Sequence, residues 1–227
     1  MSRSSINIYD ITPFTLLDFP DTPAAIFWLA GCNMYCPYCH NAEIVHGKNR
    51  YPFQKALEFL QKRRGLLEGV VISGGEPTLH PELQTICSSI KELGFLIKLD
   101  TNGSRPEVVQ RLLDADLLDF VALDLKAPPY KQTLFASFNL YDRVLQTLRF
   151  LLRSSTPFEV RTTVHTDLLE EGDIQYLAAL LEKEGYKGPY YIQNFRNAPK
   201  TLQPIPEQNR TLSTDIPFSI DVRYRNF

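Results

Sequence analysis

Three cysteines in one short loop are the residues of this chain best suited to chemistry. Cys32, Cys36 and Cys39 follow one another with the spacing C-x3-C-x2-C, whereas Cys87 lies far downstream. Three thiolates on one tight loop can ligate three irons of a cubane cluster and leave the fourth iron open. Ferredoxin-type electron carriers use four cysteine ligands, so a missing ligand indicates that another molecule binds the open iron. The spacing of this cysteine loop (residues 31–41) therefore predicts chemistry at a cluster rather than electron storage alone.

A zinc site is the main alternative for the same loop. His40 follows Cys39 directly, which would complete a site of three cysteines and one histidine. Structural zinc sites usually take pairs of ligands from two separated places, whereas Cys87 stands alone and is better explained as a small buried hydrophobic residue. His46 and His80 are interpreted as loop or capping residues. A non-catalytic zinc or iron–sulfur binding module remains an open alternative at this point.

Alternating apolar runs and amphipathic segments predict an α/β protein. Short apolar, β-branched runs predict six strands, at 24–30, 69–72, 95–99, 120–123, 158–164 and 190–193. Helical patterns lie between them, at about 52–64, 81–93, 105–114, 139–153 and 170–184. This alternation is typical of right-handed βαβ units around a parallel sheet. Because a full barrel needs eight strands, we expect a partial or open barrel.

The chain is expected to form one domain. It has 227 residues, of which 44% are hydrophobic, and this is enough for one large core. No repeat and no low-complexity linker divides residues 1–227. We expect the core at about 22–195 and an irregular C-terminal extension at about 199–227, packed against the body. Residues 220–224 are a candidate for a short edge strand within it.

Composition excludes several classes of partner. The formal net charge of −2 shows no basic bias, which argues against binding of a nucleic-acid backbone. The N-terminus is polar and no apolar stretch approaches the length of a membrane span, so neither a secretory signal nor a membrane is expected. Four cysteines are too few for a disulfide scaffold in a chain of this length. We therefore expect a reducing, cytoplasmic location.

Polar residues follow the predicted strands at their carboxyl ends. In parallel α/β folds, functional groups collect at this edge of the sheet, so these side chains are expected around one mouth. The candidates are Gly74, Gly75, Glu76, Asp100, Thr101, Asp124, Lys126 and Arg161.

The types of these residues allow them to bind polar groups of a ligand. Adjacent glycines at 74 and 75 allow close approach of a ligand, and Glu76 offers a carboxylate to an amino group. A plain turn before a helix would also explain the glycine pair. Asp124 and Lys126 share one face of a strand, as expected for a lined cavity, although a strand end in water is the alternative. Arg161 needs a partner or a ligand carboxylate unless its strand is exposed.

These motifs resemble those of the radical S-adenosylmethionine (radical SAM) enzymes. The cysteine spacing, with the aromatic Tyr38 before the last cysteine, is similar to their cluster motif, and residues 74–77 resemble their GGE motif. Residues 13–20 and the cysteine loop are similar to the activating enzymes of glycyl-radical proteins, especially the short activators of anaerobic ribonucleoside-triphosphate reductase. Residues 100–103, 124–126 and 191–195 extend the resemblance over most of the chain. Relatives commonly have Gly-Lys where this chain has Asp21-Thr22.

The resemblance implies a radical SAM core, a partial (β/α)6 TIM-like barrel with a 4Fe-4S cluster at its mouth. It implies that Cys32, Cys36 and Cys39 ligate three irons and that the methionyl amine and carboxylate of S-adenosylmethionine chelate the fourth. Tyr38 would then lie along the adenine. No catalytic residue is implied beyond the cluster and the S-adenosylmethionine site.

The strand-end residues acquire roles from the same resemblance. Gly74–Glu76 would meet the methionyl amine of S-adenosylmethionine. Asp124, Lys126 and Arg161 would serve its carboxylate and ribose. Asp100–Thr101, together with Asp124, matches a monovalent-cation site of some relatives, so such a cation is a further candidate ligand.

The implied activity is radical formation on a partner protein. Reductive cleavage of S-adenosylmethionine would give methionine and a 5′-deoxyadenosyl radical, which takes a hydrogen atom from a backbone glycine of anaerobic ribonucleotide reductase. Larger activators carry an insertion with further cysteines, so an external flavodoxin or ferredoxin is expected as electron donor here. Alternative functions are a pyruvate formate-lyase-type activase and a small-molecule radical SAM enzyme such as 7-carboxy-7-deazaguanine synthase.

Overall fold

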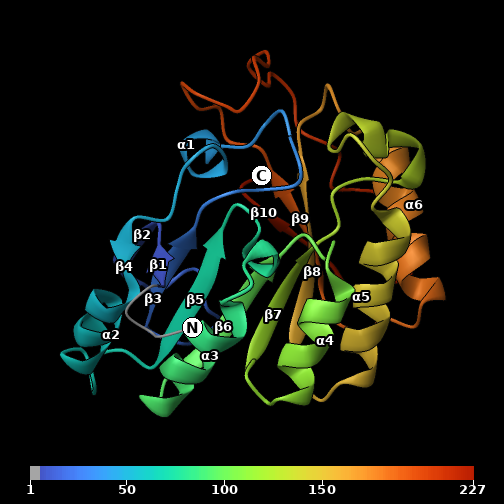
Figure 1. Cartoon of the computed structure of the whole chain (residues 1–227). Coiled ribbons are helices and arrows are strands. Elements are labelled where there is room, and N and C mark those ends of the chain that lie inside the picture. Colours follow the sequence, from blue (N-terminus) through green and yellow to red (C-terminus); the bar gives the residue numbers. More distant parts are fainter. Residues whose placement is uncertain (1–5) are drawn as a thin grey trace. The chain divides into compact units, whose positions relative to one another are not determined.

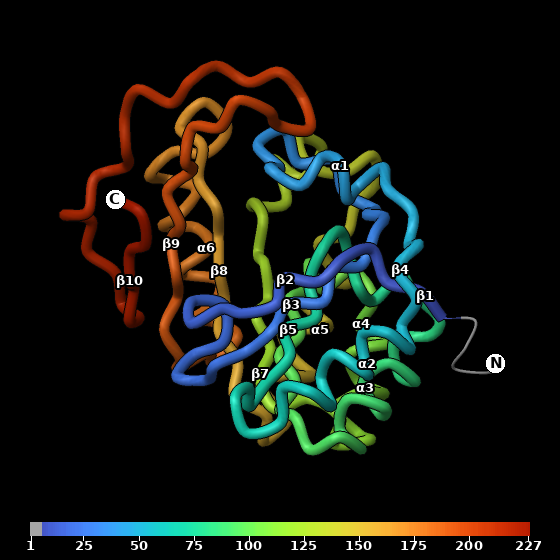
Figure 2. Tube along the Cα trace, turned by 90° about the vertical axis from the view of Figure 1, so that its left-hand side faces the viewer, coloured from blue at the N-terminus to red at the C-terminus, as the bar shows by residue number. Residues whose placement is uncertain are grey.

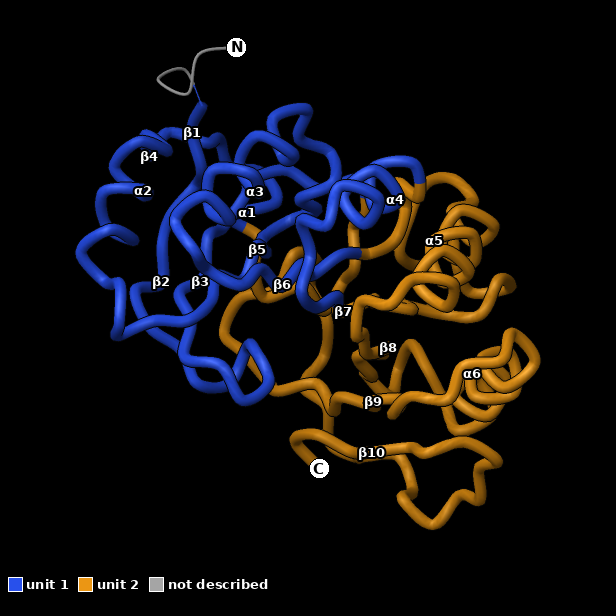
Figure 3. Tube along the Cα trace, turned by 90° about the horizontal axis from the view of Figure 1, so that it is seen from below, with its two compact units in different colours: residues 1–33, 43–101, 107–121 blue, residues 34–42, 102–106, 122–227 orange. Residues whose placement is uncertain are grey.

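A computed structural model describes residues 6–227, which form two compact units (Figure 3). Unit 1 is built from residues 6–33, 43–101 and 107–121. Unit 2 is built from residues 34–42, 102–106 and 122–227. The chain therefore passes from one unit to the other inside the cysteine loop, and Cys32 belongs to unit 1 while Cys36 and Cys39 belong to unit 2.

Unit 1 is built on a mostly parallel sheet with the strand order β6-β5-β3-β2 (Figure 1). The strands are β2 (Asp10–Thr15), β3 (Ala24–Leu29), β5 (Gly69–Gly74) and β6 (Leu96–Thr101). β3, β5 and β6 are parallel, and the register of β3 with β5 runs from Ala24 opposite Gly69 to Leu29 opposite Gly74. β2 is antiparallel to β3. A separate antiparallel pair joins β1 (Asn7–Ile8) to β4 (Tyr51–Pro52).

The helices of unit 1 follow its parallel strands along the chain. They are α1 (Ala42–Val45), α2 (Phe53–Gln61), the 3-10 helix η2 (Pro77–Leu79), α3 (Leu83–Glu92) and α4 (Pro106–Asp114), of which α1 and α4 begin at the last residue of a unit 2 segment. α2 buries Phe53, Ala56, Leu57 and Leu60, whose spacing is that of one apolar helix face. Gly94 ends α3 in the left-handed region with φ of 85°, as a helix-terminating glycine does.

Unit 2 has the strand order β10-β9-β8-β7. These strands are β7 (Phe120–Asp124), which begins in unit 1, β8 (Phe158–Val164), β9 (Tyr190–Asn194) and β10 (Val222–Arg225). β8, β9 and β10 are parallel. The helices are the 3-10 helix η3 (Pro129–Leu134), α5 (Tyr141–Arg153) and α6 (Glu171–Lys183).

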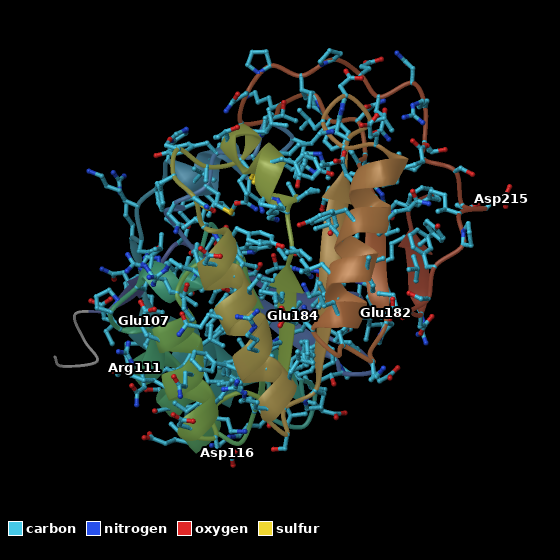
Figure 4. All side chains as sticks on the ribbon, turned by 90° about the vertical axis from the view of Figure 1, so that its right-hand side faces the viewer. Glu107, Arg111, Asp116, Glu182, Glu184 and Asp215 are labelled. Carbon is cyan, nitrogen blue, oxygen red and sulfur yellow. The ribbon has the colours of Figure 1, made fainter. Side chains whose placement is uncertain are left out.

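Side chains at the end of α6 connect it to two other segments of unit 2. Glu184 accepts hydrogen bonds of 2.7 Å from both Nε and Nη2 of Arg149 on α5. Glu182 accepts one of 2.6 Å from Ser219 of the C-terminal extension. Figure 4 shows both glutamates at the same end of α6. The C-terminal extension is thus attached to α6 through Ser219 as well as to β9 through β10.

The predicted elements are confirmed, with small shifts at their ends. The six predicted strands correspond to β3 and β5 to β9, the five predicted helices to α2 to α6, and the candidate edge strand to β10. β2 was missed because it is a half-exposed edge strand interrupted by Pro13, so its sequence shows no regular alternation. Pro106 is the first residue of α4, a position that proline favours, whereas Pro52 and Pro81 lie just before their helices. No helix within residues 6–227 is long and apolar enough to cross a membrane.

We expect Asp173 to stabilise unit 2 through its buried hydrogen bonds. Its carboxylate accepts from Tyr130 Oη at 2.9 Å, Lys131 Nζ at 2.6 Å and the backbone N–H of Glu170 at 2.8 Å. Asp173→Ala leaves these donors without their acceptor and should lower the free energy of unfolding by about 2–4 kcal/mol in urea denaturation. The exposed Asp142 lies in the first turn of α5, and Asp142→Ala should change it by about 0.5 kcal/mol at most. Equal effects of the two substitutions would contradict the assignment.

Candidate functional site

The first cysteine lies against the glycine motif inside unit 1. A Cβ atom added to Gly75 would be 3.2 Å from the Cβ of Cys32 and only 2.0 Å from the carbonyl oxygen of Gly31. One added to Gly74 would lie 2.2 Å from the carbonyl oxygen of Leu29. The sequence predicted that a ligand approaches these glycines closely, but the atoms that do so here are the chain's own backbone. Any side chain at these positions would collide with β3 and the start of the cysteine loop.

Backbone hydrogen bonds join the same two motifs. The N–H of Gly75 donates to Leu29 O at 2.9 Å, and the N–H of Glu76 donates to Gly31 O at 2.8 Å. These bonds continue the β3–β5 ladder past the ends of both strands. The glycine motif and the residue before Cys32 are consequently parts of one hydrogen-bonded structure.

The Glu76 carboxylate is fully buried and serves the chain's own hydrogen bonds. Its Oε1 accepts from the N–H of Thr78 at 3.0 Å, from Thr101 Oγ1 at 2.8 Å and from Thr78 Oγ1. Thr101, which ends β6, is thereby brought to the glycine motif of β5. A carboxylate oriented this way is held rigidly, as a binding residue must be.

Asp100 is paired with a buried lysine that the sequence analysis did not select. Lys98 is 2% exposed and forms an ion pair with Asp100, which also accepts a hydrogen bond of 3.2 Å from Ser73 Oγ. Lys98 and Asp100 are two residues apart on β6 and so share one face, the same signal that drew attention to Asp124 and Lys126.

Asn49 and His80 hold the residue that precedes the cysteine loop. Asn49 Oδ1 accepts from the N–H of Ala30 at 2.8 Å, and His80 Nε2 donates to Ala30 O at 2.8 Å. His80 Nδ1 then accepts from Asn49 Nδ2 at 3.3 Å, which fits a neutral ring, and burial lowers the pKa of His80. The interpretation of His80 as a loop or capping residue missed this contact, because only the folded chain brings it to Ala30.

The other two cysteines lie in unit 2. Cys39 N–H donates to Cys36 O at 3.0 Å, so the two residues form one tight turn. Cys36 is buried, Cys32 and Cys39 are half-buried, and none of the three forms a disulfide. Desolvation raises the pKa of Cys36 to about 11 despite the opposing charge of Lys126. A thiol in this setting loses its proton on binding a metal rather than to water.

Tyr38 has a buried hydroxyl without a hydrogen-bond partner among residues 6–227. Its ring packs against Phe135 and Phe195, with centroid distances of 5.7 and 6.4 Å. An unpaired buried hydroxyl is costly, so such a group in a native fold demands an explanation. A polar group of a bound ligand beside Tyr38 would satisfy it.

His40 is engaged by the protein. Its Nε2 donates to Arg196 O at 3.0 Å, and its ring lies 5.0 Å from that of Phe195. These contacts disfavour His40 as the fourth ligand of a zinc site. Within residues 6–227 no three His, Cys, Asp or Glu side chains converge as a ready metal site. The donor set nevertheless fits a cluster, because three cysteines outside disulfides in this spacing match iron–sulfur ligation.

Asp124 is held between two cations in unit 2. Lys126 Nζ donates to its Oδ2 at 3.0 Å and Arg161 Nε to its Oδ1 at 2.9 Å. Burial would raise the pKa of Asp124, but the charges of Arg161 and Lys126 outweigh it and hold the pKa well below its usual range. Burial opposes the charge on Lys126 too, yet Asp124 keeps the pKa of this lysine raised. Arg161 was predicted to need a partner or a ligand carboxylate, and in the structure its partner is Asp124.

A second buried carboxylate, that of Glu159, lies next to Arg161 and is also paired with an arginine. Glu159 lies 3.8 Å from Arg161 Nη1 and accepts two hydrogen bonds, of 3.2 and 2.9 Å, from Arg225 of β10. The Arg225 guanidinium stacks 3.5 Å above the Tyr191 ring. Sequence reasoning missed Glu159 and Arg225, because their contact joins residues that are far apart along the chain.

The structure thus collects the predicted residues into two groups. Cys32, Gly74, Gly75, Glu76, Asp100 and Thr101 belong to unit 1, and Cys36, Tyr38, Cys39, Asp124, Lys126 and Arg161 belong to unit 2. The charges of Lys126 and Asp124 act on both Cys36 and Tyr38. Paired cations, free thiols and an unpaired hydroxyl in one unit suit a charged, polar cofactor.

A comparison with protein families decides the identity. The profile of the radical SAM superfamily matches residues 26–181. This chain belongs to the radical SAM superfamily. It is a radical SAM enzyme, so both predicted cofactors of the superfamily, a 4Fe-4S cluster and S-adenosylmethionine, are confirmed. The alternative of a non-catalytic zinc module is not retained.

Sequence relatives include activating enzymes and other radical SAM enzymes. A protein of Methanocaldococcus jannaschii, provisionally named a glycyl-radical enzyme activating enzyme, is 31% identical over 216 residues, covering 88% of this chain and 86% of its own. A second protein of that organism with the same provisional description is 26% identical, covering 73% and 64%. A 7-carboxy-7-deazaguanine synthase of Synechocystis sp. is 34% identical over 104 residues, or 45% of each chain.

Solved structures show the same fold at low identity. SuiB of Streptococcus suis bound to S-adenosylmethionine superposes with a TM-score of 0.63 and 12% identity, over 86% of this chain and 48% of SuiB. Native anSMEcpe with bound AdoMet gives a TM-score of 0.59 and 18% identity, over 74% and 50%. The predicted radical SAM fold with mostly parallel strands is thereby confirmed, and a partial (β/α)6 barrel is consistent with it.

We expect the ion pairs of Asp124 to make the free energy of unfolding depend on pH. Because its folded pKa lies below the value of about 3.9 in the unfolded chain, its contribution is complete above about pH 5 and is lost as pH falls toward the folded pKa. In urea denaturation, Asp124→Asn should start less stable at pH 7 and lose less stability than the native protein between about pH 5 and pH 3. Parallel pH profiles for the two proteins would contradict the ion-pair assignment.

Proposed function

We propose that this radical SAM enzyme activates a partner enzyme by generating a glycyl radical on it. The observation that carries the proposal is the 31% identity, over most of both chains, to a provisionally named activating enzyme of this kind. With a cluster held by the three cysteines and S-adenosylmethionine beside it, one electron from an external donor would break a C–S bond of the sulfonium. This would release methionine and provide a radical able to take a hydrogen atom from a backbone glycine. We further propose anaerobic ribonucleoside-triphosphate reductase as the partner and a flavodoxin or ferredoxin as the electron donor.

The chain's own residues are proposed to bind, orient and shield. Cys32, Cys36 and Cys39 are proposed as the ligands of three irons. The close contact of Cys32 with the glycine motif supports binding of the methionyl amine beside Gly74, Gly75 and Glu76. The buried ring of Tyr38 is proposed to border the adenine and to keep water from this part of the site.

The paired charges are proposed to recognise the polar ends of the same molecule. Lys126 and Arg161, fixed by Asp124, suit the carboxylate and ribose of S-adenosylmethionine. For the monovalent cation, Asp100 and Thr101 offer oxygen ligands, although both already have partners in unit 1. The cation and the cytoplasmic location stay predictions.

The activity is testable with purified partners. Reconstituted anaerobically with reductant and S-adenosylmethionine, the protein should release 5′-deoxyadenosine and produce the doublet EPR signal of a glycyl radical on anaerobic ribonucleotide reductase. Cys36→Ala should abolish both signals. A doublet only on a pyruvate formate-lyase-type enzyme would reassign the partner, and cleavage with no doublet on any glycyl-radical protein would overturn the activase proposal.

A small-molecule reaction is the second candidate function. 7-Carboxy-7-deazaguanine synthases occur among the relatives, and that of Methanopyrus kandleri is 24% identical while covering 93% of this chain and 89% of its own. Turnover of the pterin substrate of those synthases, without a partner protein, would favour this candidate. The same assay without product supports the activase.

Tyr38→Phe should separate protein stability from cofactor binding. Removing the unpaired hydroxyl should raise the free energy of unfolding of the apo-protein by about 1 kcal/mol, because no buried polar group is left unsatisfied. If bound S-adenosylmethionine pairs with this hydroxyl, its dissociation constant should rise about five- to tenfold in equilibrium binding to the reconstituted protein.

Tyr190→Phe is the matched control for this experiment. Tyr190 is equally buried, but its hydroxyl donates to Thr162 Oγ1 at 2.6 Å. Its loss should lower stability by about 1 kcal/mol and leave S-adenosylmethionine binding unchanged. Unchanged binding in Tyr38→Phe would remove the hydroxyl from the cofactor site.

A further inference from the structure

The C-terminal extension hydrogen-bonds to the cysteine loop. Leu202 N–H donates to Cys39 O at 2.9 Å, and Gln203 N–H donates to Pro37 O at 3.3 Å. The side chain of Gln203 donates from Nε2 to Tyr35 O at 3.0 Å. Figure 2 shows the chain after β9 passing to this loop before it returns to β10. Three alternate carbonyl groups of the loop therefore bind donors of residues 201–203, which we name the strap.

The cysteine loop depends on donors and acceptors outside itself. Residues 30–36 contain no helix or strand, and within the turn that follows the N–H of Cys39 donates to Cys36 O. At its other side the loop is held where Tyr35 N–H donates to Phe135 O at 2.7 Å. Irregular backbone of this kind keeps one conformation only when its polar groups have fixed partners.

The strap is itself anchored within unit 2. Thr201 Oγ1 donates to Gln203 O at 2.7 Å, which stiffens the strap. Beyond it, Pro206 O accepts from His165 Nε2 at 3.0 Å, and Gln208 Nε2 donates to Asn194 Oδ1 at 2.6 Å. The strap and the residues that follow it therefore connect the cysteine loop to the ends of β8 and β9.

We propose that the strap is a positioning element that keeps the cysteine loop in its cluster-ligating conformation. Three thiolates must converge on one cluster, so a loop that moves freely would release iron more readily. Donors of Leu202 and Gln203 fix the carbonyl groups of three loop residues, Tyr35, Pro37 and Cys39. Two of the proposed ligands, Cys36 and Cys39, lie within this stretch. Gln203 is the one strap residue that acts through its side chain and its backbone together. The inference rests on the cluster of the superfamily and is independent of the partner protein.

The test compares two glutamine substitutions in the reconstituted protein. Gln203→Glu keeps the size of the side chain but replaces the donor to Tyr35 O by a carboxylate. Gln208→Glu is the control, because it makes the same chemical change at another position of the C-terminal extension. It removes the donor to Asn194 Oδ1 and does not affect a bond to the cysteine loop. Cluster loss to an iron(II) chelator under anaerobic conditions is followed by visible absorbance, and urea denaturation of each protein measures its stability.

We expect Gln203→Glu to lose its cluster about three- to tenfold faster than the native protein, the factor that one lost hydrogen bond of this type produces. It should also alter the EPR spectrum of the reduced cluster, while Gln208→Glu matches the native protein in both measurements. Native rates and spectra for both variants would overturn the inference. Equal acceleration in both, in proportion to lost stability, would overturn it as well, since that result indicates a general structural effect. Neither outcome depends on whether a glycyl radical is formed.

Discussion

A loop without helix or strand must obtain its rigidity from elsewhere in the chain, and this constraint on the cysteine loop explains much of the structure. In unit 1, Asn49 and His80 bind both polar groups of Ala30, and the glycine motif binds Gly31. In unit 2, the end of η3 and the strap bind the backbone from Tyr35 to Cys39. Each partner satisfies a backbone group that a helix or a sheet would otherwise satisfy. In unit 1, the glycine motif and the start of the cysteine loop are thus joined by backbone hydrogen bonds.

Buried charges form a second organising feature. Burying an ion without a partner is too costly, because the ion loses its hydration, and each of these charges has a partner of opposite sign. The groups are Asp124 with Lys126 and Arg161, Lys98 with Asp100, and Glu159 with Arg225. Each group includes a residue of a parallel strand, and Asp100 and Asp124 stand at the ends of theirs. Pairing with Asp124 holds Lys126 and Arg161 in fixed orientations, as recognition of a carboxylate requires.

Much of the fold was predictable from local patterns. Apolar runs and helical periodicity found the parallel strands and the helices between them, because each pattern reflects which side of an element is buried. β2 escaped because an edge strand with Pro13 buries little and shows no alternation. Tyr38, Asp124 and Lys126 were recognisable from motif and spacing. Lys98 and Asn49 were not selected, because a lysine in a strand and an asparagine in a loop are ordinary until their partners are known.

The sequence by itself determined the chemistry of this protein. Thiol spacing, the glycine pair and the charged strand ends are local facts, and they were sufficient to predict a cluster, S-adenosylmethionine and the superfamily. Tertiary structure alone decided how those residues are held. It showed that Gly74 and Gly75 lie against the backbone of Leu29 and Gly31 and that Arg161 pairs with Asp124. It also showed that residues 201–203 bind the cysteine loop. The physical reason is that hydrogen bonds and ion pairs join atoms by proximity in space, and residues separated by more than 160 positions, such as Tyr35 and Gln203, have no local signal of their contact.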